Sequence, residues 1–282
     1  MNILLLGKTG QVGFELHRTL SPLGTISAPS REDLNLLDEQ AVDQFLANTK
    51  PSLIVNAAAW TAVDAAENQQ VEAQRLNAGL PAQLARYAVA NNARLVHYSS
   101  DYVYPGTGTN PWQETSSTGP LSVYGQTKLE GDQAIQSSGA DHLIFRTSWV
   151  YSARGNNFMK TMLRMAESKT ELNIVADQIG APTPARLIAQ VTALAVHSTL
   201  EVGLYHLAPT GETSWQGFAK EIFRLGGKNT KANPIPTSDY PTPATRPLNS
   251  RMDTTKLQQA LNIQLPDWQS QVALTLNEYL ET

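Results

Sequence analysis

The sequence predicts an α/β fold in which a doubly wound parallel sheet carries a smaller C-terminal lobe. Through the first half of the 282 residues, short apolar runs alternate with segments of helical periodicity. Such alternation is typical of parallel strands joined by right-handed helical crossovers. A glycine-rich turn directly follows the first apolar run, and the hydrophobic fraction is 41%, which is ample for a buried core.

Five strands and four helices are expected in the first half. Pro51 opens the third strand, and Asp38 is placed to cap a helix with a single apolar stripe. The ligands of such sheets lie at the carboxyl ends of the strands, so we look for chemistry there. The expected strands are residues 3–6, 25–28, 52–57, 94–99 and 141–147; the helices are 11–20, the segment after Asp38, 81–91 and 122–137.

The second half has a less regular pattern. Helices are expected at 156–167, at 183–200 and from Trp268 to Leu280. Two apolar runs, 172–176 and 204–207, are expected to be strands that return to the main sheet. The stretch 233–249 holds five prolines and is expected to be an ordered loop.

Composition excludes several classes of protein. The net charge is −4 and there is no long basic run, so nucleic-acid binding is not expected. The absence of cysteine rules out disulfides and thiolate sites and is compatible with a reducing cytoplasm. No apolar run approaches the ~18 residues that span a bilayer. The five histidines are scattered, form no metal motif and are interpreted as structural.

The first strand is followed by a glycine turn with the spacing G-x-x-G-x-x-G, from Gly7 to Gly13. Between a strand and a helix, such glycines let backbone N–H groups approach a pyrophosphate at the helix N-terminus. Lys8 does not make the turn a P-loop, because no Gly-Lys-Ser/Thr closes it. The turn predicts a Rossmann-type dinucleotide site that includes Gly7, Thr9, Gly10, Gln11 and Val12.

The end of the second strand is expected to contact the adenosine ribose. Ser30 and Arg31 suit a 2′-phosphate and favour NADPH, whereas Glu32 and Asp33 leave NADH open. Two further sets of residues are included in the candidate cofactor site. They are Asn35 and Leu36, which follow the second strand, and Ala57, Ala58, Ala59 and Thr61, whose small side chains serve either a flat cofactor or close helix packing.

The most informative pair is Tyr124 and Lys128, four residues apart and therefore on one face of a helix. A free tyrosine has a pKa of about 10, and a neighbouring cation would lower it. The phenol would then be a usable general acid or base. Ser100, at the end of the fourth strand, could bond a carbonyl that Tyr124 protonates.

The order of glycine turn, strand-end hydroxyl and Y-x-x-x-K resembles the short-chain dehydrogenase/reductase superfamily. Further motifs, spread over nearly all 282 residues, resemble the dTDP-4-dehydrorhamnose reductase family. These motifs are Lys8–Gly13, Asn56–Ala59, Thr61–Asp64, Ser100–Tyr104, Tyr124–Lys128, Arg146–Tyr151, Asp177–Thr183 and Arg246–Ser250.

The resemblance implies reduction of the C4 keto group of a dTDP-linked 4-keto-6-deoxysugar by NADPH. Tyr124 would protonate the C4 oxygen, Lys128 would lower the pKa of Tyr124 and hold the nicotinamide ribose, and Ser100 would orient the carbonyl. The family commonly has Thr where this chain has Ser100. The implied substrate-binding residues are Val63, Asp64, Asp101, Tyr102 and Trp149, with Arg246 either at the diphosphate or merely a surface charge.

The resemblance also suggests a division of the chain and bears on its assembly. Residues 1–148 are expected to form the Rossmann domain and residues 149–282 mainly a substrate-binding lobe. Some family members dimerise through a magnesium ion held by acidic residues. Glu15 and Glu278 match two of these positions, but Arg186 occupies the third and would repel a cation. No metal is therefore expected, and the chain is expected to be a monomer or a metal-independent homodimer.

Two alternatives stay open. Nucleotide-sugar epimerases and dehydratases share this superfamily, but the dehydratases usually place an Asp–Glu pair after the catalytic hydroxyl, and position 102 here is Tyr. A non-catalytic NADP-binding regulatory subunit would tend to lose catalytic residues, whereas Ser100, Tyr124 and Lys128 are all present.

Overall fold

The computed structural model describes residues 1–198 and 200–281. Its centre is a six-stranded sheet of order β10-β5-β4-β3-β1-β2, in which every neighbouring pair is parallel. The doubly wound α/β fold is therefore confirmed. The strands are β1 (Asn2–Leu6), β2 (Thr25–Ser27), β3 (Leu53–Asn56), β4 (Arg94–Ser100), β5 (Asp141–Thr147) and β10 (Gly203–His206).

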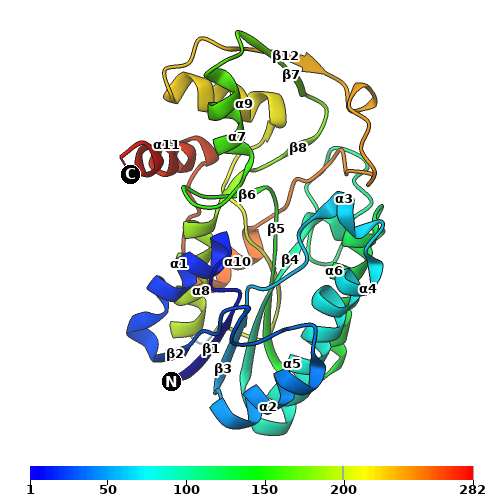
Figure 1. The fold of residues 1–282 in the computed structure, drawn as a ribbon, viewed down its shortest axis with the longest axis vertical. Coiled ribbons are helices and arrows are strands. Elements are labelled where there is room, and N and C mark those ends of the chain that lie inside the picture. Colours follow the sequence, from blue (N-terminus) through cyan, green and yellow to red (C-terminus); the bar gives the residue numbers. More distant parts are fainter. Residues whose placement is uncertain (199, 282) are drawn as a thin grey trace.

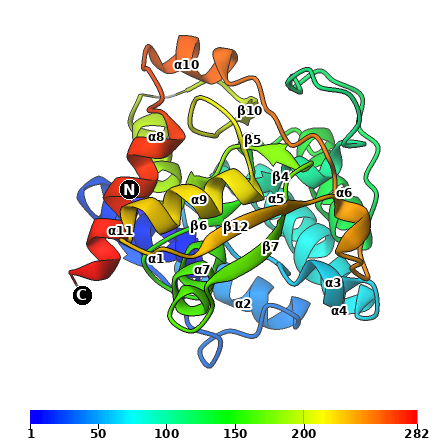
Figure 2. The same ribbon diagram turned by 90° about the horizontal axis from the view of Figure 1, so that it is seen from above.

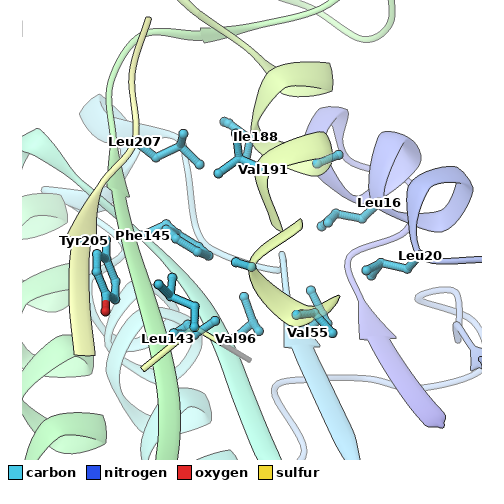
Figure 3. Close-up of a cluster of buried hydrophobic side chains, with 14 of the residues drawn as sticks. Leu16, Leu20, Val55, Val96, Leu143, Phe145, Ile188, Val191, Tyr205 and Leu207 are labelled. Carbon is cyan, nitrogen blue, oxygen red and sulfur yellow. The ribbon is translucent and has the colours of Figure 1, made fainter. Parts of the chain in front are cut away.

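Helices cover both faces of the sheet (Figure 1). On one face lie α1 (Gln11–Thr19), α8 (Ala185–His197) and α10 (Thr255–Leu261). Their apolar side chains and those of the strands form one core, to which Leu16, Ile188 and Phe145 belong (Figure 3). The other face carries α2 (Glu39–Thr49), α5 (Leu80–Asn91) and α6 (Val123–Ser137), with a second core.

A smaller lobe stands at one end of the sheet, and Figures 1 and 2 show its helices and strand pair together. The lobe contains α7 (Phe158–Ala166), α9 (Trp215–Leu225), α11 (Trp268–Leu280), and the parallel strands β7 (Glu171–Val175) and β12 (Lys231–Ile235). Phe218 and Val272, both without exposed surface, lie in a third core that these elements share.

Two expectations for this half were wrong. The apolar run at 172–176 forms β7, but β7 pairs only with β12 and does not return to the main sheet, because its buried side chains pack in the core of the lobe. The loop expected from residue 233 includes the last residues of β12, with Pro234 inside the strand. Proline is tolerated there because β12 has only one partner strand. The strand expected at 204–207 is β10, which pairs with β5.

Several helical boundaries also differ. The helix expected at 183–200 begins at Ala185, since β9 (Thr183–Pro184) pairs with β6 (Val150–Tyr151). Of the expected ranges, positions 199 and 282 lie outside the described residues. The helix expected from Pro81 belongs to a longer helical path that begins at Gln70 and widens into a π-type turn just before Pro81. Proline has no backbone N–H to donate, and a change in the hydrogen-bond pattern at this point accommodates it.

The other elements are short. The described part of the chain has no helix that is long and apolar enough to cross a membrane. The short helices are η1 (Ser21–Leu23), α3 (Val63–Ala66), α4 (Gln70–Gln74), η2 (Arg75–Gly79), η3 (Asp101–Val103) and η4 (Thr237–Asp239), and one antiparallel pair joins β8 (Ile179–Gly180) to β11 (Thr213–Ser214).

Candidate active site

The glycine turn lies where the strand order reverses, between the ends of β1 and β3. Gly7 has φ +83°, and a Cβ there would lie 2.7 Å from the backbone of Ala57 and from the nitrogen of Ala58. A side chain at position 7 is therefore excluded by both conformation and space. The structure thus brings Gly7 directly against the expected Ala57–Ala58 segment, and Ala59 and exposed Thr61 follow.

The first helix opens without a side-chain cap. Its N-cap is Gly10, no acidic residue lies in its first turn, and the first N–H groups of any helix have no partner within the helix. Exposed Thr9 flanks the turn, while Val12 packs on the core. The Gln11 side chain accepts hydrogen bonds from Ser152 and Asn157, which tie this turn to the lobe. The helix end is thus suited to bind an anion.

The loop after β2 has mixed charge. Asp33 accepts hydrogen bonds from the backbone and hydroxyl of Ser30, at 2.8 and 2.7 Å, and these bonds lower the pKa of Asp33. Arg31 is exposed beside them, Asn35 accepts from a backbone N–H in a turn, and Leu36 packs against the core. The Asp33 carboxylate therefore accepts a hydrogen bond from the Ser30 hydroxyl, the same group that was expected to bind a 2′-phosphate.

The position of α6 depends on Gly125. A Cβ at Gly125 would lie 2.3 Å from the carbonyl oxygen of Tyr102, so only glycine lets the helix approach the end of β4 this closely. Ser122 caps the helix by accepting from the Gly125 N–H. As a result the rings of Tyr102 and Tyr124 meet edge to face, with centroids 5.4 Å apart.

Ser100 and Asp101 lie at the end of β4. The Ser100 hydroxyl accepts from the Tyr102 N–H at 3.2 Å and donates to Oδ1 of Asp101 at 3.0 Å. Asp101 is 2% exposed, and burial raises its pKa to about 6, although hydrogen bonds from Ser250 and Ser100 oppose this.

Burial also governs Tyr124. It raises the pKa of Tyr124 to about 12, although the Ser100 hydroxyl lowers it in part. Lys128 is fully buried and its Nζ donates to the carbonyl oxygen of Tyr98 at 2.6 Å, with Nε2 of His97 at 3.3 Å. Burial lowers the pKa of Lys128 to about 8. The pKa of Tyr124 is thus raised and not lowered as expected, because burial is the largest effect on it.

Three of the remaining candidates, Asp64, Arg246 and Trp149, form side-chain pairs. Arg246 makes a forked ion pair with Asp64, with distances of 2.9 and 3.1 Å. Trp149 has φ +49°, in the left-handed region, and stacks on Trp215 with centroids 3.9 Å apart. Val63 begins α3, next to Asp64. Residues from both halves of the chain are therefore brought together.

Sequence reasoning missed several polar and aromatic neighbours of the site. His97, Asp132 and Trp215 are among them; Asp132 lies one turn beyond Lys128 on α6 and pairs with Arg146 at 2.9 Å. The i, i+4 spacing of Lys128 and Asp132 was the available signal. His97 had none, because its contact with Lys128 depends on the fold.

The acidic positions expected near Arg186 do lie together. Arg186 binds Glu15 at 3.3 Å and Glu278 at 2.8 Å, so a guanidinium bridges the two carboxylates. Within residues 1–198 and 200–281, no cluster of three or more His, Asp or Glu could hold a metal ion. Two cavities, of about 370 and 720 Å³, are lined by none of the candidate site residues.

A doubly wound parallel sheet, a glycine turn at its strand-order reversal, and a helical Tyr–Lys pair in which Lys128 is buried and Tyr124 half-buried define a Rossmann-type protein of the short-chain dehydrogenase/reductase kind. A family model described as the RmlD substrate binding domain matches residues 1–281. The chain therefore belongs to that family.

Relatives of known name are similar along their whole length. The dTDP-4-dehydrorhamnose reductase of Escherichia coli K12 is 48% identical over 296 residues, which span 100% of this chain and 99% of that protein. The spore coat polysaccharide biosynthesis protein SpsK of Bacillus subtilis 168 is 34% identical, over 99% of this chain and 96% of that one.

Solved structures agree. A dTDP-4-dehydrorhamnose reductase from Clostridium acetobutylicum superposes with a TM-score of 0.95 at 34% identity, covering 100% of both chains. One from Bacillus anthracis, in complex with NADP, gives 0.93 at 31% identity and covers 98% of each.

Proposed function

We propose that this chain reduces the C4 keto group of dTDP-4-dehydro-β-L-rhamnose to give dTDP-L-rhamnose, with NADPH as the reductant. The observation that carries the proposal is full-length similarity, at 48% identity, to a named dTDP-4-dehydrorhamnose reductase. Ser100, Tyr124 and Lys128 support it, since a reductase of this fold needs a hydroxyl, an acid and a cation at one place.

The residues present fit a dinucleotide. The uncapped end of α1 offers backbone N–H groups to a pyrophosphate, and the space at Gly7 and Ala57 admits no further side chain. Gly7, Thr9, Gly10, Gln11 and Val12 would hold the diphosphate. The adenosine end would lie at Ser30, Arg31, Asn35 and Leu36, and the nicotinamide end at Ala57–Ala59, Thr61, Tyr124 and Lys128. When bound, NADPH supplies the hydride.

The chain supplies the proton. A phenol whose pKa is about 12 is fully protonated at neutral pH, and an alkoxide is a much stronger base than a phenolate. Tyr124 can therefore donate its proton to the C4 oxygen as negative charge develops there. Ser100 would hold that oxygen, and the ammonium of Lys128 would stabilise the tyrosinate that is left.

The sugar nucleotide would lie between the sheet and the lobe. Val63, Asp64, Asp101, Tyr102 and Trp149 are assigned to its pocket, and Arg246 to its diphosphate. The stacked pair Trp149–Trp215 gives a rigid apolar wall, and the guanidinium of Arg246 is already aligned by Asp64. We assign residues 149–282 mainly to substrate binding. The exceptions are β10, which belongs to the main sheet, and α8 and α10, which cover it.

The test is incubation of the protein with NADPH and the 4-keto sugar nucleotide. Stoichiometric loss of NADPH absorbance and a product with the C4 configuration of L-rhamnose are expected. Turnover without NADPH consumption would instead indicate an epimerase or dehydratase. Tight NADPH binding with no turnover would indicate a regulatory subunit, and the assignment would be abandoned.

A further inference from the structure

The side-chain nitrogen of Lys128 is enclosed by protein. Its Nζ has two polar neighbours on β4, the carbonyl oxygen of Tyr98 at 2.6 Å and Nε2 of His97 at 3.3 Å. Lys128 is 1% exposed and His97 is 0% exposed, so both contacts lie in the protein interior. An enclosed amine needs hydrogen-bond partners in whichever protonation state it adopts.

His97 is held in turn by the neighbouring strand. Asn56, the last residue of β3, is its register partner across the sheet, and the Asn56 side-chain amide lies 3.2 Å from Nδ1 of His97. The amide oxygen of Asn56 accepts from the Ala58 N–H at 3.3 Å. A line of polar contacts therefore runs from α6 through β4 to the Ala57–Ala59 segment.

His97 stays neutral in this position. Burial, together with the charge of Lys128, keeps the pKa of His97 well below its usual value. A neutral imidazole has one N–H donor and one lone-pair acceptor, and it can exchange which nitrogen carries the proton. The same ring can thus accept from a lysine ammonium or donate to a lysine amine. The present orientation of Asn56, with its amide nitrogen facing Nδ1, matches the tautomer that donates to a lysine amine. To match the other tautomer, the amide must turn and give up the hydrogen bond that its oxygen accepts from the Ala58 N–H.

We propose that His97 is a positioning residue that holds the side-chain nitrogen of Lys128, one helical turn from Tyr124, in both protonation states of the lysine. The inference rests on the proposed function, in which the ammonium of Lys128 stabilises the tyrosinate. It explains why a histidine is buried here with both ring nitrogens engaged. Lysine can then lose or regain a proton without leaving its place.

A matched pair of variants separates the two ring nitrogens. In His97→Gln the side-chain amide reaches as far as Nε2 and keeps a group that can accept from or donate to Nζ. In His97→Asn the amide reaches only to the place of Nδ1, which keeps the link to Asn56 and loses the lysine. The other ionisable groups around Lys128 are unchanged in both: Tyr124 and Asp132 on α6, and Arg146 on β5.

The pH dependence of kcat/KM is the first measurement. His97→Asn deprives the Lys128 ammonium of an acceptor, which lowers the pKa of the lysine. We therefore expect the alkaline limb of the kcat/KM profile to move about one pH unit lower and kcat to fall about tenfold. His97→Gln is expected to keep the wild-type limb and to lose no more than about threefold in kcat. Equal profiles for the two variants, whether normal or impaired, would overturn the inference.

Two measurements do not depend on turnover. NADPH affinity, read from quenching of tryptophan fluorescence, is expected to weaken at alkaline pH in His97→Asn but not in His97→Gln. In the wild type, the ¹⁵N shift of His97 Nε2 is expected to change with pH as Lys128 titrates, and to stay constant in Lys128→Met. An unchanging shift in the wild type would overturn the inference even if neither His97 variant folds.

The affinity and ¹⁵N measurements also distinguish the role of His97 from the proposed reductase activity. A wild type that binds NADPH but reduces no 4-keto sugar nucleotide would refute the proposed function, while the affinity and ¹⁵N measurements would still decide the role of His97.

Discussion

The Ser100 hydroxyl donates a 3.0 Å hydrogen bond to Oδ1 of Asp101, its neighbour in the chain. The serine proton is therefore directed at the carboxylate, and the serine oxygen also accepts from the Tyr102 N–H. Asp101 is almost fully buried, so the pair combines a reactive hydroxyl with a carboxylate that is costly to ionise.

Asp101→Asn is expected to stabilise the fold at neutral pH. The folded pKa of about 6 exceeds the unfolded value, so the folded chain binds more protons between about pH 4 and 6 and loses stability as pH rises through that window. The variant removes this loss. The free energy of unfolding is expected to rise by roughly 2 kcal/mol at pH 7.5 and to match the wild type near pH 4.

Urea unfolding at the two pH values measures this difference. Asp239→Asn, an exposed aspartate in η4, is the control and is expected to change little at either pH. A stability gain that is equal at pH 4 and pH 7.5 would show that the ionisation of Asp101 is not its cause.

Tyr124→Phe is expected to bind NADPH normally and to lose most activity. The ring and its edge-to-face contact with Tyr102 are kept, whereas the proton donor is lost, which for a general acid costs about a hundred- to ten-thousand-fold in rate. NADPH oxidation and NADPH affinity are measured side by side. Tyr87→Phe, on α5, is the control. Full turnover by Tyr124→Phe would mean that the proton comes from another group.

The site could be predicted from the sequence where its chemistry depends on short spacings. The turn from Gly7 and the Tyr124–Lys128 pair are such cases, because a strand–turn–helix unit fixes the one and helical periodicity fixes the other. Burial cannot be read this way. The pKa of Tyr124 is raised rather than lowered because the fold removes part of the phenol from water, and the degree of burial depends on how the whole chain packs.

Partners that are distant in sequence escaped prediction for the same reason. Trp149 and Trp215 are 66 positions apart yet stacked, and the left-handed φ of Trp149 is unusual for an aromatic residue. The apolar run of β7 predicts a strand correctly, but which sheet it joins depends on the core of the lobe. Local pattern thus predicts the element and tertiary packing selects its partner.

Arg186→Glu is expected to create a dependence on divalent cations. In the wild type the guanidinium bridges Glu15 and Glu278, and the Glu15 side chain is 7% exposed. Three adjacent carboxylates would repel one another, at a cost of roughly 1–2 kcal/mol after allowance for the half-exposed arginine. Millimolar magnesium, an oxygen-binding cation, is expected to restore the loss.

Thermal unfolding with magnesium or with EDTA checks this expectation. Arg224→Glu, which breaks the pair of an exposed arginine with Glu221, is the control and is expected to cost less than about 0.5 kcal/mol, with no response to magnesium. For the wild type, mass measured by light scattering is expected to be the same with either additive. A wild-type dimer that dissociates in EDTA would contradict the assignment of Arg186 as a substitute for a metal ion.

Cofactor preference is expected to depend on Arg31 and Asp33 with opposite signs. Arg31→Ala removes a cation from the place assigned to the 2′-phosphate, so NADPH affinity is expected to fall about tenfold while NADH affinity is unchanged. Asp33→Asn removes the carboxylate that Ser30 now binds at 2.7 Å, so NADPH affinity is expected to rise severalfold. Fluorescence titrations with both dinucleotides measure the ratio. Arg86→Ala, at an exposed pair with Glu39, controls for the loss of a positive charge alone. An equal effect of Arg31→Ala on NADH and NADPH affinity would show that Arg31 does not contact the 2′-phosphate.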